Sequence, residues 1–552
     1  MSPTLYTISP FAALFLYAVY RLVVLPRFNP LLNLPGPPVP KWFGHHLRHV
    51  LDPTVSPKVH EILVKRYGHS IRIRGLGPWD ERFLTLDPVS LTHIMKDTTI
   101  YEKPWQSRTL ITSLIGCGML SAEGQVHKRQ RRVALPAFSG QNMRSLVDIA
   151  FKKGMQLTDA WVAMLPAGTD SVELNVGQWM SRATFDIMGL AGFEYNFNSI
   201  QDETNELFLA YKDMFEVAIS QGTPFRTLLS IYLPSVNKLF ADDTVRTVDR
   251  CQEVIRRVAG RLIQEKKQKI AEGEKSGDLY EGKDLLTLLL KSNTATDLRP
   301  EHRISDDDIL NNINTFMFAG SDTSSLSMTW TLLLLAQNPH IQDRLRAELL
   351  SIAPEPPRTL SDLSEDELQS LHAALSNLPL LHNVTRECLR LIPPLHSTLR
   401  VATQDDEVPT MYPVHNRDGS VNENNRSVLV PKGTFIHVSF EGFNLDKDVW
   451  GDDAWDFNPD RWDNLPEAAQ HYSWHFSNIL TFSAGSRACP GLRFALFEMK
   501  TLYYILLTNF VFKETAAKIT KHNVVLTRPY LAGKFKDGTQ CPLLVSRFIR
   551  PQ

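Results

Sequence analysis

The stretch that decides the fold is Phe482-Ser-Ala-Gly-Ser-Arg-Ala-Cys-Pro-Gly491, which places one cysteine in a glycine-containing loop beside a fixed cation. Cysteine binds metal as its thiolate anion, so Cys489 needs groups that stabilise negative charge. Gly485 and Gly491 allow backbone N–H groups to approach the sulfur closely. The apolar segment Leu492–Lys500 follows and predicts a helix whose N-terminal dipole also favours a thiolate. A free cysteine is most often a small buried hydrophobic residue, so the rest of the chain must decide between the two interpretations.

The spacing Phe482-x-x-Gly485-x-Arg487-x-Cys489-x-Gly491 resembles the heme-binding loop of the cytochrome P-450 superfamily. The resemblance implies a mainly α fold with a smaller β region, the helical heme domain of that superfamily. It also implies heme b (iron–protoporphyrin IX) as cofactor, with Cys489 as the axial ligand of the iron and Arg487 as a partner of a heme propionate.

Composition excludes several other classes of protein. The chain has 552 residues, of which 59 are Lys or Arg and 60 are Asp or Glu, so its bulk charge gives no reason to expect a nucleic-acid partner. Without any C-x-x-C pair, its cysteines argue against a disulfide framework, a zinc ribbon or an iron–sulfur cluster. A reducing compartment fits best. The five cysteines are Cys117, Cys251, Cys388, Cys489 and Cys541.

The N-terminus contains an apolar run, Phe11–Leu25, which is near the short limit for a membrane-spanning helix. A cleaved signal peptide is the alternative, but no basic segment precedes the run and no small-residue cleavage site follows it. We therefore predict an uncleaved membrane anchor at residues 1–27, a proline-rich hinge at 28–45 and a heme-thiolate catalytic domain at 46–552.

The distribution of positive charge predicts the orientation of this anchor. Arg21, Arg27 and Lys41 lie on its C-terminal side, and positive charge stays in the cytosol. The expected location is the endoplasmic reticulum membrane with a cytosolic catalytic domain.

Helical patterns dominate the rest of the chain. Ile71–Arg74 and Phe83–Leu86 predict two short strands of a small sheet, and Leu146–Ile270 predicts one helix after another. The charged stretch Arg261–Lys275 is interpreted as a solvated helix end and loop.

A dense basic cluster, Glu123–Val133, places His127 and Arg131 one turn apart on one helix face. A solvated helix face is the simplest interpretation. The resemblance implies instead that both side chains reach the heme propionates, although the family commonly has tryptophan at the position of His127. Three further cations would remain free to meet an acidic redox partner: Lys128, Arg129 and Arg132.

The segment Ser305–Gln337 predicts one long helix, because Ser305 and three aspartates form a good start and Asn338-Pro339 a good stop. Its middle, Ala319-Gly-Ser-Asp-Thr323, combines glycine, acid and hydroxyl groups that are unusual inside a helix. Helix bending or capping is one explanation. The stretch also resembles the distal helix of oxygen-activating family members, which implies that Asp322 and Thr323 deliver protons to bound dioxygen as catalytic acid–base groups.

Pro379–Leu391 predicts a helix in which Glu387 and Arg390 share a face, a spacing that usually gives only a weak surface pair. The resemblance implies that Arg461 joins them in a buried structural triad. It also implies that Arg400 meets a heme propionate.

These features together predict a heme-thiolate monooxygenase that uses O2. No flavin or nicotinamide signature stands out, so electrons would come from an NADPH-cytochrome reductase in the membrane. The expected substrate is a lipophilic small molecule, because the variable loops Tyr101–Met119, Phe215–Phe240 and Pro393–Thr398 are apolar. The resemblance to fungal microsomal members favours secondary metabolism, for example a terpenoid. The alternatives are a fatty-acid or xenobiotic hydroxylase and, in other classes, a heme-thiolate isomerase or dehydratase or a non-catalytic heme sensor.

Overall fold

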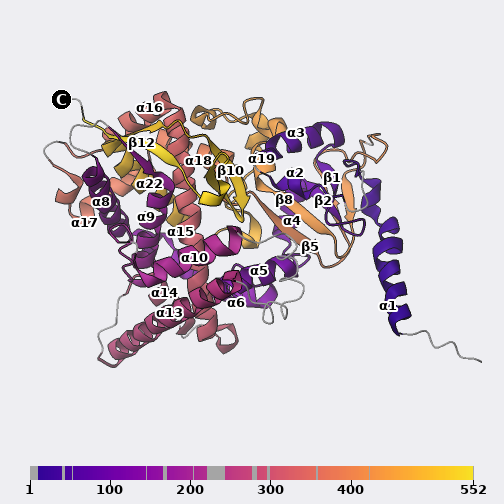
Figure 1. Ribbon diagram of the computed structural model, residues 1–552, viewed down its shortest axis with the longest axis horizontal. Helices are drawn as coiled ribbons and strands as arrows, with labels where there is room; N and C mark the ends of the chain where they lie inside the picture. Colours follow the sequence, from indigo (N-terminus) through magenta and orange to yellow (C-terminus); the bar gives the residue numbers. More distant parts are fainter. Residues whose placement is uncertain are drawn as a thin grey trace, which may run out of the picture. The chain divides into compact units, whose positions relative to one another are not determined.

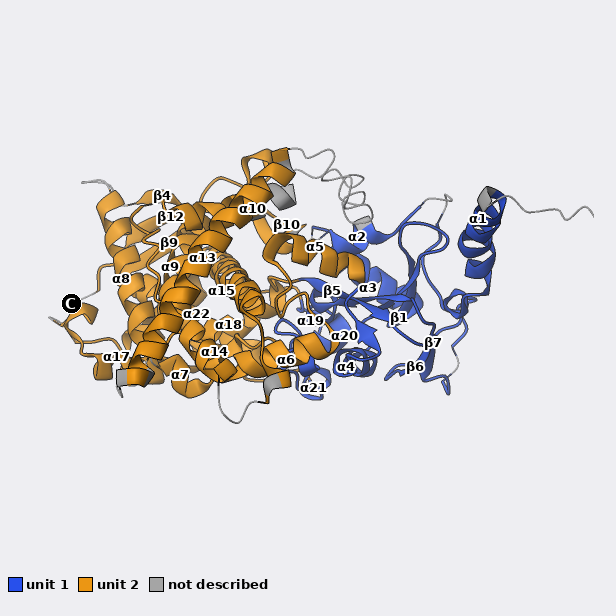
Figure 2. Cartoon of the chain, turned by 90° about the horizontal axis from the view of Figure 1, so that it is seen from below, with its two compact units in different colours: residues 1–104, 396–454, 467–488 blue, residues 105–395, 455–466, 489–552 orange. Residues whose placement is uncertain are grey.

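The computed structural model describes residues 10–39, 44–52, 54–144, 146–165, 171–202, 204–220, 243–276, 282–294, 299–355, 358–421 and 423–550. The chain forms two compact units (Figure 2). Unit 1 comprises Met1–Pro104, His396–Ala454 and Glu467–Ala488, and unit 2 comprises Trp105–Leu395, Trp455–Pro466 and Cys489–Gln552. Most helices lie in unit 2, and the largest sheet lies in unit 1. The predicted mainly α fold with a smaller β region is confirmed, whereas the predicted anchor, hinge and catalytic domain stay predictions.

Unit 1 is organised around a five-stranded sheet whose strand order is β1-β2-β8-β5-β3. The predicted pair of strands is confirmed, because β1 and β2 are antiparallel with Ile71 opposite Leu84. β8 lies parallel to β2 and antiparallel to β5. The strands are β1 (Ser70–Arg74), β2 (Glu81–Thr85), β3 (Tyr101–Glu102), β5 (Ser397–Ala402) and β8 (Phe435–Ser439), with β6 (Asp406–Pro409) and β7 (Ser427–Val430) in a separate pair.

Short helices pack around this sheet (Figure 1). Ile71 and Leu84 are completely buried in a core that also holds Val50 of α2 and Leu63 of α3. Burial of such side chains is the main term that stabilises a small sheet. The helices of unit 1 are α1 (Pro10–Val19), α2 (Leu47–Leu51), α3 (Ser56–Tyr67), α4 (Pro88–Lys96), α19 (Phe440–Asn444), α20 (Lys447–Trp450) and α21 (Glu467–Gln470).

The apolar N-terminal run is helical but changes its winding. α1 ends at Val19 and is followed by a π-helical turn, Tyr20–Val24, and a 3-10 turn, Leu25–Phe28. Within the described ranges, every helix is too short or too polar to cross a membrane. Lys41, invoked above for orientation, lies outside the described residues. The anchor and its orientation remain predictions.

Unit 2 contains a long central helix, α15 (Asp306–Gln337), as the sequence predicts. The Ser305 hydroxyl accepts a bond from the Asp308 N–H, and the Asp308 carboxylate accepts one from the Ser305 N–H, which is a capping box. α16 begins at Pro339, the second residue of the predicted stop. The other α-helices among the described residues of unit 2 are α5 (Trp105–Ile115), α6 (Gly124–Ala134), α7 (Gly140–Arg144), α8 (Val147–Met164), α9 (Val176–Phe193), α10 (Glu206–Ser220), α13 (Asp243–Ser276), α14 (Leu285–Thr294), α16 (Pro339–Leu350), α17 (Glu365–Ser376), α18 (Pro379–Leu391) and α22 (Leu492–Asn509).

The helix α13 corrects one prediction. Arg261–Lys275 is not a helix end followed by a loop, because α13 continues to Ser276. Its Lys, Glu and Gln residues are good helix formers, so solvated charge does not end the helix. One of the charges is even buried: the Lys266 ammonium donates to the Asp284 carboxylate at 2.9 Å and is itself 4 % exposed.

Close packing against neighbouring elements holds α15 in place. A Cβ at Gly320 would lie 2.2 Å from Cε of Met188 on α9, so this glycine permits the close approach of the two helices. On β11, the Thr527 carbonyl accepts a hydrogen bond at 3.0 Å from the buried Trp330 indole. Unit 2 has two small sheets, the hairpin of β10 (Ile519–Val524) and β11 (Leu526–Leu531) and the three strands β4 (Val172–Asn175), β12 (Pro542–Arg547) and β9 (Phe510–Glu514).

Candidate active site

Cys489 belongs to unit 2 and lies just before α22, beside groups that stabilise a thiolate. Burial raises the pKa of the Cys489 thiol overall, and two groups oppose this rise: the Gly491 N–H, which donates to the sulfur, and the positive charge of Arg131. The position before the N-terminus of α22 acts in the same direction. A cysteine with these three influences is suited to bind a metal as an anion.

Gly485 lies in the part of the Phe482–Gly491 loop that belongs to unit 1, and both its backbone conformation and its packing explain why it is a glycine. Gly485 has a φ of +64°, and a Cβ there would lie 2.4 Å from the carbonyl oxygen of Met95. Positive φ and close packing therefore both require glycine. Phe482 packs edge-on against Phe476 with ring centroids 5.3 Å apart.

Two of the arginines assigned to heme propionates, Arg400 and Arg487, also belong to unit 1. Arg400 is 3 % exposed, and its guanidinium donates to the Thr398 hydroxyl at 2.8 Å and to the Leu399 carbonyl at 2.9 Å. These bonds leave it in a defined position on β5. The contacts of Arg400 and Arg487 with heme propionates stay predictions.

α6 carries the other two residues assigned to the propionates. His127 is buried, and Arg131 is half-buried on the same helix. Burial lowers the pKa of Arg131, and the negative charge of Cys489 raises it. The electrostatic environment of Arg131 therefore includes Cys489.

The prediction that three cations of α6 remain free is wrong for two of them. The Arg129 guanidinium lies 3.7 Å from the Asp308 carboxylate, and the Arg132 guanidinium lies 2.7 Å from the His302 ring. Lys128 is exposed on the same helix. The sequence does not show these partners because they come from a segment more than one hundred residues further along the chain.

The middle of α15 holds its acid through an arginine that the sequence does not predict. Asp322 accepts two bonds from the Arg528 guanidinium on β11, one of them at 3.2 Å to Oδ1 and the other to Oδ2. Both side chains are mostly buried, with 16 % of Asp322 and 14 % of Arg528 exposed. Bidentate pairing of this kind fixes the orientation of the carboxylate. The neighbouring Thr323 hydroxyl donates to the Ala319 carbonyl at 2.6 Å.

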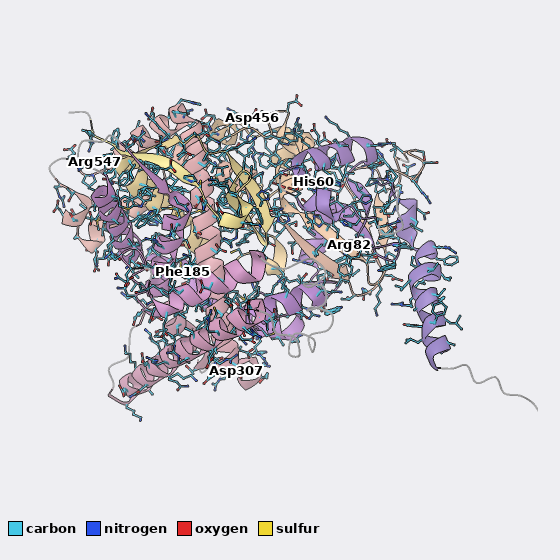
Figure 3. All side chains as sticks on the ribbon, in the orientation of Figure 1. His60, Arg82, Phe185, Asp307, Asp456 and Arg547 are labelled. Carbon is cyan, nitrogen blue, oxygen red and sulfur yellow. The ribbon has the colours of Figure 1, made fainter. Side chains whose placement is uncertain are left out.

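Asp322 and Arg528 both border an open cavity of about 900 Å³ in unit 2. α9, α10, α15, β11 and the segment 535–540 contribute to its wall, and Figure 3 labels one of its side chains, Phe185 of α9. Its size falls in the range of small-molecule sites. Six aromatic side chains contribute to its wall: Phe185, Phe208, Tyr211, Phe318, Tyr530 and Phe535.

The structure also brings together Glu387, Arg390 and Arg461, all from unit 2 and all buried. The Glu387 carboxylate accepts bonds from Arg390 at 2.8 and 2.9 Å and from Arg461 at 2.9 Å. It also accepts a bond at 3.0 Å from the indole of Trp462, a partner that the sequence does not reveal. The carboxylate therefore satisfies two buried guanidinium groups at once.

We predict that Glu387→Gln lowers the free energy of unfolding by about 3–5 kcal/mol, because it leaves buried positive charge without its counter-charge. Urea unfolding followed by circular dichroism would measure this. The matched control is Glu253→Gln on α13, because Glu253 has the same spacing to Arg256 but is exposed. The control should change the free energy by less than about 1 kcal/mol. Equal effects of the two variants would contradict the structural importance of the triad.

Known proteins resemble this chain over nearly its whole length. The family profile of cytochrome P450 matches residues 35–533. Cytochrome P450 monooxygenase 205 of Postia placenta is 36 % identical over 543 residues, covering 96 % of each chain. Cytochrome P450 monooxygenase 128 of the same fungus is 33 % identical and covers 97 % of this chain and 96 % of its own. Ganoderic acid synthetase of Ganoderma lucidum is 32 % identical over 94 % of each chain. The chain therefore belongs to the cytochrome P450 family, whose members are oxidoreductases that hold heme b through a cysteine.

Proposed function

We propose that this cytochrome P450 monooxygenase binds its heme iron through Cys489 and oxidises a lipophilic small molecule of secondary metabolism. The environment of Cys489 carries the proposal: a backbone N–H, the charge of Arg131 and the start of α22 all stabilise an anionic sulfur. This donor set fits the thiolate that heme iron requires. A bound heme supplies the activation of dioxygen and the one-electron chemistry.

The residues of the chain would orient the cofactor and move protons. His127, Arg131, Arg400 and Arg487 are the proposed partners of the propionates. Phe482, Gly485 and Gly491 shape the loop that carries the sulfur.

Asp322 and Thr323 are the proposed proton-transfer groups. Water in the cavity that borders Asp322 can give a proton to its carboxylate, and the Thr323 hydroxyl is the next group along α15. The Arg528 guanidinium holds the carboxylate of Asp322 and is therefore a positioning residue. An acid held in this way favours oxygen activation over an isomerase, a dehydratase or a heme sensor, none of which needs proton delivery by this pair.

The proposed substrate class rests on the lining of the cavity and on the relatives. The aromatic wall of the cavity suits an apolar molecule, and one relative is named ganoderic acid synthetase. A terpenoid or a related secondary metabolite is the substrate class we propose, with a fatty acid or xenobiotic as the alternative. Turnover of a panel of lipophilic candidates by the reconstituted enzyme, followed by mass spectrometry, would separate these classes.

An NADPH-cytochrome reductase in the endoplasmic reticulum membrane is the proposed electron donor. The exposed apolar side chains of α1, such as Leu14 and Phe15 at 65 and 67 % exposure, support attachment of the N-terminus to a membrane. Fractionation of cells that express the chain without residues 1–27 would check this location.

On α6, Lys128 is the cation that we propose for docking of the reductase, because Arg129 and Arg132 contact partners within unit 2.

The axial ligand can be tested without turnover. We predict that the wild-type protein shows the ferrous–CO absorption band of thiolate ligation and that Cys489→His replaces it by a band of histidine ligation or abolishes heme binding. The control is Cys117→Ala, because Cys117 is an exposed cysteine of the same unit. A wild-type band typical of histidine ligation would overturn the proposal.

The Arg528–Asp322 pair generates a prediction about coupling. With Arg528→Met we expect product formed per NADPH to fall on the order of tenfold, with more hydrogen peroxide, because Asp322 loses the group that orients it. The pH profile and the solvent isotope effect on product formation should change as well. Arg528→Lys should restore part of the coupling.

The matched control for this pair is Lys536→Met, which removes an exposed cation of the same cavity. The control should leave the coupling and the pH profile unchanged. If Arg528→Met behaves like the control, then Asp322 does not depend on Arg528.

For the reductase, we predict that Lys128→Glu lowers the rate of heme reduction severalfold at low ionic strength and that the difference shrinks as salt is added. Stopped-flow reduction by the purified reductase would measure both. Lys513→Glu, an exposed charge reversal on β9, is the control. Equal rates and equal salt dependence for the two variants would remove Lys128 from the docking surface.

A further inference from the structure

A second cluster of metal-ligating groups lies in unit 1, which does not contain Cys489. Ligand atoms of His69, Asp446 and Asp448 all lie within 4.8 Å of one another. His69 precedes β1, whereas Asp446 and Asp448 lie at the start of α20. The fold therefore brings together residues that are far apart in the sequence.

Two of the three ligand atoms are buried without a hydrogen-bond partner. His69 is 6 % exposed and Asp446 is 8 % exposed, and neither Nε2 of His69 nor Oδ2 of Asp446 forms a hydrogen bond with the described residues. An unsatisfied buried polar atom is costly, so each such atom requires an explanation. A shared cation would satisfy both atoms.

Two of the three side chains, those of His69 and Asp446, are oriented by further contacts. The His69 ring stacks on the Tyr412 ring, with centroids 4.0 Å apart and an angle of 14°. Oδ1 of Asp446 accepts a hydrogen bond from the Asp448 N–H at 3.0 Å, which directs Oδ2 toward His69. Two lysines beside the cluster, Lys65 and Lys447, form ion pairs with Glu61 at 2.7 and 3.2 Å.

The two distances from His69 to the carboxylates fit the ligands of a tetrahedral ion. Nε2 of His69 lies 3.3 Å from Oδ2 of Asp446 and 3.5 Å from Oδ2 of Asp448. Nitrogen and oxygen ligands of tetrahedral zinc, at about 2.0–2.2 Å from the ion, lie about 3.3–3.6 Å from one another. The octahedral geometry of Mg²⁺ would require about 2.8–3.0 Å and favours oxygen ligands only.

A fourth ligand has room beside the carboxylates. Asp446 and Asp448 border a cavity of about 20 Å³, which also contacts His60 of α3, labelled in Figure 3. This is enough space for one water molecule. Asp448 is 59 % exposed in its side chain, so an ion can enter from solvent.

We propose that His69, Asp446 and Asp448 bind one zinc ion, with water as the fourth ligand. Two carboxylates balance the charge of the ion, and the neutral imidazole contributes its nitrogen. The ion links the segment before β1 to the start of α20 and so stabilises unit 1. None of its three residues belongs to the groups proposed above to hold the heme or to move protons. In the competing arrangement there is no metal, and the His69 ring faces the two carboxylates directly.

The test uses the full heme-loaded chain, freed of metal by a chelator and titrated with zinc chloride. Zinc retained after gel filtration is measured by mass spectrometry, and the melting temperature is measured with and without zinc. We expect one tightly bound zinc ion per chain and a melting temperature that rises when zinc is added. Asp448→Asn, on an exposed side chain that does not threaten folding, should weaken zinc binding by at least about tenfold and abolish the rise.

The matched control is Asp452→Asn, which removes an exposed carboxylate four residues further along the chain. It should bind zinc like the wild type. His69→Gln, if it folds, should lose the zinc as Asp448→Asn does. Failure of the wild type to bind zinc would overturn the proposal, as would equal zinc binding by the wild type and Asp448→Asn.

Discussion

Negative charge on the Cys489 sulfur is the condition on which the other features of the site depend. Burial alone would keep the thiol protonated, because it raises the thiol pKa. The Gly491 N–H and the positive charge of Arg131 on α6 oppose this rise and stabilise the thiolate form. The loop that carries Cys489 is therefore followed directly by a helix, α22, and the sulfur lies within the electrostatic influence of a second, cationic helix, α6.

Unit 2 contains two buried glutamates, Glu387 and Glu498, whose surroundings differ. Glu387 contacts the guanidinium groups of Arg390 and Arg461 and fixes the positions of both. Glu498 of α22 is also fully buried, and burial raises its pKa to about 8, so it is protonated at neutral pH. Glu387 thus has two cationic partners, whereas desolvation dominates the surroundings of Glu498.

Local signals explain what the sequence could predict. Ser305 and the three aspartates after it mark the start of α15, and the alternation around Ile71 marks β1, because caps and side-chain periods depend on neighbouring residues. Cys489 could be assigned because its loop carries a dense pattern. The partners of Asp322 and Glu387 could not all be predicted, since Arg528 and Trp462 approach from distant segments and carry no local signal.

The β10–β11 hairpin connects the two parts of the proposed reaction. Arg528 and Tyr530 are two residues apart on β11 and therefore lie on the same face of the strand. Both border the cavity, where Tyr530 contributes to the aromatic wall and Arg528 holds Asp322. In the proposed reaction, a ligand in contact with β11 would therefore act on the group that orients the acid. The binding of substrate and the delivery of protons would both depend on the position of this strand, which is fixed to α15 by the bond from Trp330 to Thr527.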